Sequence, residues 1–208
     1  MTTGRATARV GIVACGALAL HLRAILDRRR WAGDVELYSL PPLLHNRPER
    51  IAPEVDALLA RLGDRHERLA VAYADCGTYG ALDAALARHD DVERLPGAHC
   101  YDVVAGAEEM ARLSAEEPGT YFLTDFLVRT FDRIVVRELG LDRYPELRDD
   151  YFRHYRRLVW LAQAPTPALE AEAERAAEVL GLPLEIRETG EGRLEAALGV
   201  LIGVAATA

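Results

Sequence analysis

Apolar residues occur in two alternating patterns along the chain. Short, largely apolar runs recur through most of the sequence, and such runs are typical of strands buried in a parallel sheet. The predicted strands cover residues 8–15, 34–40, 68–75, 156–163 and 183–189, with a shorter strand within 91–104.

Between these runs the apolar residues follow helical spacing. A period of three to four residues over a longer segment predicts an amphipathic helix. Pro53 suits the first turn of one such helix, and Gly63 suits its end. The predicted helices cover residues 16–30, 53–65, 80–89, 106–117, 119–139, 144–155 and 167–181.

The alternation of strands and helices indicates the fold class. It predicts an α/β protein with an open, mostly parallel, doubly wound (Rossmann-like) sheet and helices on both faces. No linker or internal repeat divides the sequence, so residues 1–208 are predicted to form a single α/β domain. The helical stretch within residues 106–155 is expected to form a cap insert over the sheet edge.

Charge and hydropathy narrow the function classes. The formal net charge of −8 disfavours binding to nucleic acid or to anionic membranes, because both require a basic surface. No apolar run is long enough to span a bilayer, and the apolar stretch near the N-terminus has no clear cleavage site. We therefore expect a cytoplasmic protein that acts on a small molecule and binds neither nucleic acid nor a membrane.

Three cysteines and one histidine follow different predicted strands. Cys15 ends the first strand, His45 lies in the loop after the second, Cys76 follows the third and Cys100 follows the short fourth strand. The carboxyl ends of parallel strands meet at one edge of a sheet, where ligands bind in open α/β proteins. Cytoplasmic thiols are expected to be reduced. The three cysteines are therefore predicted to be metal ligands at this edge.

Glycine follows two of the cysteines, as Gly16 and Gly77. Small residues let the backbone approach a bulky cofactor, so Gly16, Gly77 and His45 are predicted to contact it. A helix is expected to begin after each cysteine–glycine pair, and its positive end would favour the thiolate form of the cysteine.

Three interpretations of this site stay open. Three thiolates without a fixed fourth ligand favour an iron–sulfur cluster, such as a [4Fe–4S] cluster with one open iron position. Three thiolates together with His45 or His99 would suit tetrahedral zinc. In a protein without metal, Cys76 or Cys100 would be the nucleophile and one of the two histidines its base.

Three further residues are candidate catalytic acids or bases: Asp75, His99 and Asp125. Asp75 would alternatively cap the following helix. Asp125 interrupts an apolar helix and would alternatively form an ion pair with Arg129, four residues further on. Because alternate residues of an extended segment point in opposite directions, His99 is expected to face away from Cys100.

Five sequence blocks together resemble one known family. The blocks are ACGAL, LHNRPERI, ADCGTYGALD, GAHCYDVVAG and GTYFLTDFLVRTF. Between about residues 10 and 189 they resemble the domain-of-unknown-function family 1638 (DUF1638). The resemblance implies that the three cysteines, His45 and His99 lie in family motifs. It also implies a cytoplasmic protein of the kind found in bacteria and methanogenic archaea. Some members are encoded near corrinoid-dependent methyltransferases, which implies a link to one-carbon metabolism.

Three functions are consistent with these features. The first is a metal- or thiol-dependent enzyme that catalyses sulfur transfer, methyl transfer or a lyase reaction. The second is a protein that delivers a metal or a corrinoid-type cofactor, with a second copy, a corrinoid protein or a methyltransferase as its partner. The third is an α/β protein whose cysteines only pack. No nucleotide-binding glycine motif and no serine nucleophile elbow is present, so nicotinamide, nucleotide and serine-hydrolase chemistry have little support.

Overall fold

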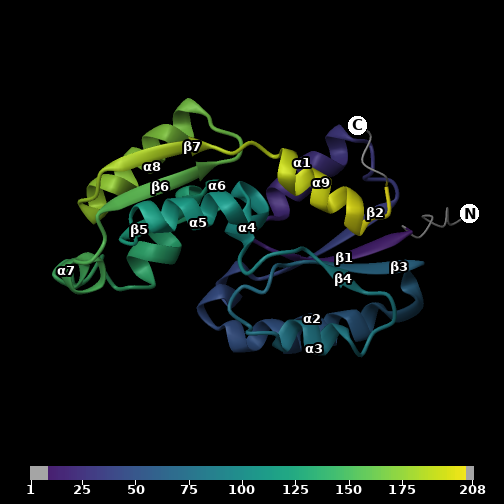
Figure 1. The fold of residues 1–208 in the computed structure, drawn as a ribbon. Coiled ribbons are helices and arrows are strands. Elements are labelled where there is room, and N and C mark those ends of the chain that lie inside the picture. Colours follow the sequence, from purple (N-terminus) through teal and green to yellow (C-terminus); the bar gives the residue numbers. More distant parts are fainter. Residues whose placement is uncertain (1–8, 205–208) are drawn as a thin grey trace, which may run out of the picture. The chain divides into compact units, whose positions relative to one another are not determined.

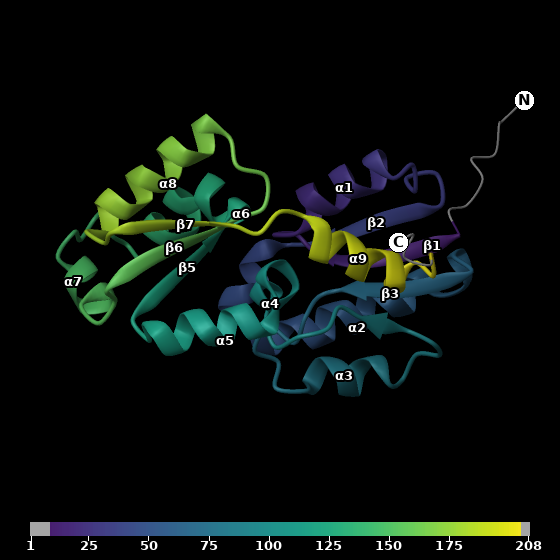
Figure 2. The same cartoon turned by 45° about the horizontal axis from the view of Figure 1, so that its top comes forward.

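The computed structural model of the protein describes residues 9–204 (Figures 1 and 2). Its contacts divide the chain into two compact units. The first unit contains the described residues up to Val103 and those from Arg193 onward, and the second contains Val104–Gly192. The single domain over residues 1–208 stays a prediction.

The first unit is built on four parallel strands in the order β2-β1-β3-β4. β1 is paired on both sides, because Val10 lies opposite Val35 of β2 and opposite Arg68 of β3. Every residue of β1 is buried, as expected for a central strand that is covered on both faces. The strands are β1 (Val10–Cys15), β2 (Val35–Leu40), β3 (Arg68–Ala72) and β4 (Glu93–Arg94).

Helices cover both faces of this sheet. α1 and α9 lie on one face, and α2 and α3 lie on the other (Figures 1 and 2). α2 ends at Gly63, whose φ of 38° is in the left-handed region, as the sequence predicts. In this part of the chain the elements labelled η are 3₁₀-helices. The helices are α1 (Ala19–Arg28), η1 (Pro42–Asn46), η2 (Pro48–Arg50), α2 (Ile51–Leu62), η3 (Gly63–Arg65), α3 (Ala81–Leu86), α4 (Cys100–Ala105) and α9 (Gly192–Leu201).

The second unit is built on three parallel strands in the order β5-β6-β7. In the central strand, Leu158 lies opposite Tyr121 of β5 and opposite Leu184 of β7. Leu123, Trp160 and other apolar side chains on one face of this sheet pack against α6 and α8 to form its core. The elements are α5 (Ala107–Glu116), β5 (Thr120–Thr124), α6 (Asp125–Arg129), the π-helix η4 (Asp132–Arg137), α7 (Leu147–Phe152), β6 (Arg157–Ala162), α8 (Pro167–Leu180) and β7 (Leu184–Glu188).

The predicted α/β class with parallel strands is confirmed, but the described strands form two sheets rather than one. β4 has only two residues, Glu93 and Arg94, so it offers little edge to which a further strand could add. The first four strands therefore end one sheet, and β5 begins another.

The predicted helix over residues 119–139 is wrong in its first part. Thr120–Thr124 forms strand β5, and the helix begins only at Asp125. The segment is rich in β-branched and aromatic residues, which fit a pleated strand, and pairing with β6 satisfies its backbone. The predicted helical cap over residues 106–155 consequently contains a strand of the second sheet.

Helix length bears on the expected cytoplasmic location. Among residues 9–204, no helix combines the length and the apolar character that crossing a membrane requires. The location itself stays a prediction.

Asp125 is fully buried in the second unit, with 0% of its surface exposed. The indole N–H of Trp160 donates to its Oδ1 at 2.9 Å, and the backbone N–H of Gln163 donates to the same oxygen at 3.0 Å. The backbone N–H of Ala164 donates to Oδ2 at 2.8 Å. These contacts join the start of α6 to the end of β6. They give Asp125 a structural role, and the catalytic role predicted for it stays a prediction.

Asp125→Asn is expected to destabilise the fold. The asparagine side chain would keep one acceptor oxygen. Its NH₂ group would replace the other oxygen and would face an N–H donor, from which it cannot accept a hydrogen bond. We expect the free energy of unfolding to fall by about 2–4 kcal/mol, because buried donors lose a charged acceptor. Chemical denaturation would measure this loss. Asp150→Asn is the matched control, because Asp150 is exposed. Equal stability of the two variants would contradict the structural role.

Candidate metal centre

The predicted thiols and His45 lie at the carboxyl ends of the strands of the first sheet. Cys15 is the last residue of β1, and His45 lies in η1, which follows β2. Cys76 lies four residues beyond the end of β3, and Cys100 is the first residue of α4. The topology therefore brings four side chains from separate parts of the sequence to one edge, as the sequence predicts.

Three of these side chains form a compact donor set. One ligand atom from each of His45, Cys76 and Cys100 can be chosen so that all three lie within 4.8 Å of one another. Two thiols and an imidazole are ligands that zinc and other thiophilic ions prefer. The Cys15 Sγ lies outside this set and is 3.9 Å from each ring nitrogen of His45. His45, Cys76 and Cys100 could therefore hold a metal.

The orientation of His45 is typical of a metal ligand. Its Nδ1 lies 3.0 Å from the backbone oxygen of Pro42, so Nδ1–H donates to that carbonyl. This bond places a proton on Nδ1, so Nε2, once it has lost its own proton, is the nitrogen that would bind a metal. Histidines that ligate metals usually donate their second ring N–H in this way, which fixes the ring and strengthens the ligand.

Cys76 lies in a turn with unusual backbone geometry. Its φ is 51°, and Gly77, Tyr79 and Gly80 also have positive φ values, of 83°, 52° and 86°. A non-glycine residue in the left-handed region costs about 1–2 kcal/mol. This conformation turns the chain sharply after β3.

The carboxylate of Asp75 holds this turn. Its Oδ1 accepts hydrogen bonds from the Thr78 hydroxyl at 2.7 Å and from the Gly80 N–H at 2.9 Å, and Oδ2 accepts one from the Tyr79 N–H at 3.0 Å. Burial opposes ionisation, but the donors from Gly80 and Thr78 outweigh it and lower the pKa of Asp75. Asp75 therefore positions the loop that carries Cys76, and the catalytic role predicted for it stays a prediction.

Backbone hydrogen bonds bring Cys100 close to Cys76. The Asp75 N–H donates to the Gly97 carbonyl at 3.2 Å, and the Cys76 N–H donates to the Ala98 carbonyl at 2.7 Å. The chain then enters α4 at Cys100. The expectation that His99 and Cys100 alternate along an extended segment is therefore wrong.

Asp102 stabilises the start of α4. Its Oδ2 accepts hydrogen bonds from the N–H groups of Ala98 and His99, at 2.8 and 3.1 Å. Gly97 lies close to this carboxylate, because a Cβ on Gly97 would come within 2.8 Å of the Asp102 Cβ. The loop before Cys100 is thus fixed by the hydrogen bonds of the Asp102 carboxylate and by the close packing of Gly97 against Asp102.

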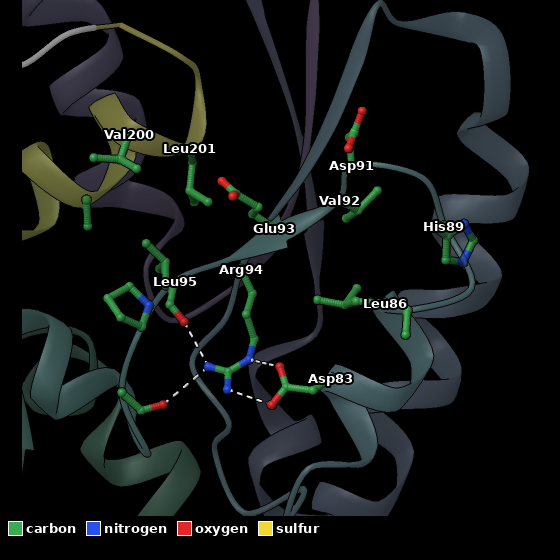
Figure 3. Close-up of a pocket in the computed structure, with 14 residues that line it drawn as sticks. Asp83, Leu86, His89, Asp91, Val92, Glu93, Arg94, Leu95, Val200 and Leu201 are labelled. Atoms are coloured by element: carbon green, nitrogen blue, oxygen red, sulfur yellow. Dashed lines mark hydrogen bonds and ion pairs between the residues drawn. The ribbon is translucent and has the colours of Figure 1, made fainter.

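Arg94 is a positioning residue that sequence reasoning missed. It lies in a groove of about 780 Å³ beside β4, α3 and α9 (Figure 3). Its guanidinium makes two hydrogen bonds to the Asp83 carboxylate, at 2.5 and 2.9 Å, and also donates to the backbone oxygens of Leu95 and Gly97. Arg94 therefore ties α3 to the loop that leads to Cys100. In the sequence, Arg94 is a charged residue in a short edge strand, and nothing in the neighbouring residues predicts that it fixes this loop.

The two glycines predicted to contact a cofactor have other neighbours. A Cβ on Gly16 would lie 2.6 Å from the Leu40 carbonyl oxygen and 2.8 Å from Pro42 Cδ. Gly16 therefore lets the segment that leads to His45 pass directly across the end of β1. Gly77 needs its positive φ, and its added Cβ would contact Pro48 at 3.5 Å. Both glycines thus pack against the segment around His45.

The thiols and the imidazole perturb one another. The Cys100 thiol, followed by His45, lowers the pKa of Cys76 to about 5 despite burial. The same contact with Cys76, together with burial, raises the pKa of Cys100. Burial disfavours the charged form of His45, but Cys15 and Cys76 outweigh it and raise its pKa to about 11. The helix α3 begins only at Ala81, so neighbouring side chains, rather than the predicted helix end, favour the Cys76 thiolate.

Tyr73 is a further residue that sequence reasoning missed. It lies just beyond β3 and is fully buried, with 0% of its surface exposed. Its ring stacks on His45 with 6.2 Å between centroids and 19° between planes. Burial and the nearby Cys15 and Cys76 thiols raise its pKa, so the hydroxyl keeps its proton. That hydroxyl has no well-formed hydrogen bond to any described residue.

The other two predicted catalytic residues are not members of the donor set. His99 is exposed, and its ring stacks on Tyr101 with 6.5 Å between centroids. Asp125 belongs to the second unit, whereas every residue of the donor set belongs to the first. The roles predicted for these two residues stay predictions.

In a comparison with protein families, residues 39–198 match the model described as "Protein of unknown function (DUF1638)". The chain belongs to this family. The matched part of the chain includes the three members of the donor set and Tyr73, and it begins after Cys15. The DUF1638 resemblance is thus confirmed, although the ACGAL block lies outside the matched residues. Neither the curated proteins nor the solved structures include a match.

Gly16→Ala is expected to disturb His45. The new Cβ would meet the Leu40 carbonyl and Pro42, which carries the acceptor for His45, and neither backbone group can move freely. We expect a loss of about 1–3 kcal/mol in the free energy of unfolding, as for an overpacked site, together with weaker binding of any metal that His45 ligates. Denaturation and a competitive metal titration would measure both. Gly33→Ala is the matched control, since a Cβ there meets nothing within 4 Å. Indistinguishable variants would contradict this account of Gly16.

Proposed function

We propose that this protein is a metal-dependent enzyme that binds a single ion, favoured to be zinc, through His45, Cys76 and Cys100. The observation that carries the proposal is the compact donor set, in which three ligand atoms lie within 4.8 Å of one another. The hydrogen bond from His45 to the Pro42 carbonyl supports it independently, because it directs Nε2 away from the backbone.

The spacing of the donors favours one ion over an iron–sulfur cluster. Zinc binds sulfur at about 2.3 Å and nitrogen at about 2.0–2.1 Å, so tetrahedral neighbours lie about 3.5–3.8 Å apart. Donors within 4.8 Å can reach that spacing through small side-chain rotations. A cluster bound by three cysteines would place several irons and sulfides between the thiolates, and the imidazole of His45 would stand among them. The geometry therefore supports zinc, the alternative from the sequence, more than the cluster.

The arrangement of Cys15 favours an open fourth position. Its Sγ is equally far, at 3.9 Å, from both ring nitrogens of His45, so it is in line with neither the Nδ1–H bond nor the outward direction of Nε2. It also lies outside the compact set. Zinc sites with three protein ligands and an open position are typical of catalysis, whereas four protein ligands are typical of structure.

The surroundings support an enzyme rather than a delivery protein. Cys15, Tyr73 and Cys76 are buried, with 0%, 0% and 7% of their surfaces exposed, and the other two donors, His45 and Cys100, are half-buried. A delivery protein is expected to expose its metal to a partner, whereas an enzyme encloses it beside a proton donor. A divalent ion held there would supply Lewis-acid chemistry. His45, Cys76 and Cys100 would hold that ion, and Cys15 and Tyr73 would contact a small substrate. Sulfur transfer, methyl transfer and a lyase reaction are the proposed reaction classes.

Metal analysis of the protein purified without oxygen would test the ligand set. We expect one zinc per chain and no acid-labile sulfide. The His45→Gln, Cys76→Ser and Cys100→Ser variants are each expected to lose at least tenfold in zinc affinity. The Cys15→Ser variant is the matched control, because it removes a buried thiol from the same edge, and it should keep its zinc.

Different outcomes would point elsewhere. Iron together with sulfide in the wild-type protein would replace the zinc proposal by the cluster. Loss of zinc from Cys15→Ser would indicate a closed site with four protein ligands and a structural role. A folded protein that binds neither metal would overturn the proposed function.

A further inference from the structure

The hydroxyl of Tyr73 is a buried polar group directed at the donor set. The residue is fully buried, and the hydroxyl has no hydrogen-bond partner of normal geometry among the described residues. Leaving such a group unpaired costs about 1–3 kcal/mol, so buried hydroxyls normally have partners. A phenylalanine would fill the same space without that cost. The hydroxyl therefore calls for a partner that is not part of the described chain.

The neighbours of Tyr73 show where that partner binds. The ring stacks on His45, and the thiols of Cys15, Cys76 and Cys100 are all close enough to act electrostatically on the phenol. The phenol is thus electrostatically coupled to all three thiols, and its ring lies against a member of the donor set. His45, Cys76 and Cys100 form the donor set, and both Cys15 and the ring of Tyr73 lie beside His45.

We infer that the Tyr73 hydroxyl donates a hydrogen bond to the substrate atom that takes the fourth coordination position of the metal. This inference rests on the proposed function, because it requires an ion on His45, Cys76 and Cys100. It makes Tyr73 a substrate-contacting residue and defines the chemical class of the substrate.

The class follows from counting lone pairs. The bound atom must give one lone pair to the ion and keep another to accept the hydrogen of Tyr73. The sulfur of a thiolate and the oxygen of an alkoxide or a carboxylate meet both demands. The nitrogen of an amine or an imidazole has only one lone pair to offer, so it can bind the ion but cannot also accept from Tyr73. The hydroxyl of Tyr73 therefore favours small molecules that bind through sulfur or oxygen over those that bind through nitrogen.

The test uses the full-length protein loaded with Co²⁺, whose visible absorption reports the ligands of the ion. Wild type and Tyr73→Phe would each be titrated with 2-mercaptoethanol, acetate and imidazole. Tyr73→Phe is expected to bind the first two about tenfold more weakly, the effect of one hydrogen bond to a charged acceptor, and to bind imidazole equally well. Tyr121→Phe, which removes a hydroxyl from the second unit, is the matched control and should behave as wild type in all three titrations.

Three results would overturn the inference. The first is an equal loss for all three probes, which would indicate general damage to the site. The second is no loss for any probe. The third is a wild-type spectrum that no probe changes, which would mean a closed coordination sphere. In each of these cases cobalt still binds, so the metal centre stands. Failure of the folded wild type to bind cobalt would instead overturn the proposed function and, with it, the inference.

Discussion

Two backbone hydrogen bonds hold the candidate metal centre together, from the N–H groups of Asp75 and Cys76 to the carbonyls of Gly97 and Ala98. They join the chain after β3 to the chain after β4, and β4 itself pairs through only two residues. The sheet alone would fix the second of these segments poorly. Arg94 and Asp102 hold the same loop through side-chain contacts with its backbone. The distance between the two ligand thiols therefore depends on loop hydrogen bonds more than on the sheet.

The same turn carries backbone strain that its own side chains offset. Cys76 and Tyr79 both have left-handed φ values, and each costs about 1–2 kcal/mol. The Asp75 carboxylate accepts three hydrogen bonds from this turn, and a bond to a charged acceptor contributes about 1.5–3 kcal/mol. These hydrogen bonds oppose the strain and hold the turn that carries Cys76 in one conformation. An organised turn lowers the free energy lost when a ligand binds.

The sequence predicts the edge of the sheet correctly but not the finer parts of the site. Cys15, His45, Cys76 and Cys100 follow separate apolar strands, and parallel topology alone brings such residues together. Tyr73 continues an apolar strand, and nothing local shows that its hydroxyl meets thiols far away in the sequence. The β5 strand was missed for a related reason. A short apolar run fits a buried helix as well as a strand, and only its pairing with β6 distinguishes them.

The residues around the donor set are a poor choice for stability. Thiols, a phenol and an imidazole share this interior, where aliphatic side chains would pack without polar atoms that need partners. The Tyr73 hydroxyl has no well-formed hydrogen bond within the part of the chain that the structure describes. Elsewhere in the first unit the interior is conventional, since β1 and α2 bury mostly aliphatic side chains. Folded proteins depart from such packing mainly where function requires it. At the carboxyl edge of the first sheet, two thiols and the imidazole of His45 form the donor set, and the ring of Tyr73 stacks on His45. A metal ion with a small bound ligand would give all of these polar groups partners at once. Replacing one polar side chain by an apolar one would resolve the unmet hydrogen bonding of that group alone.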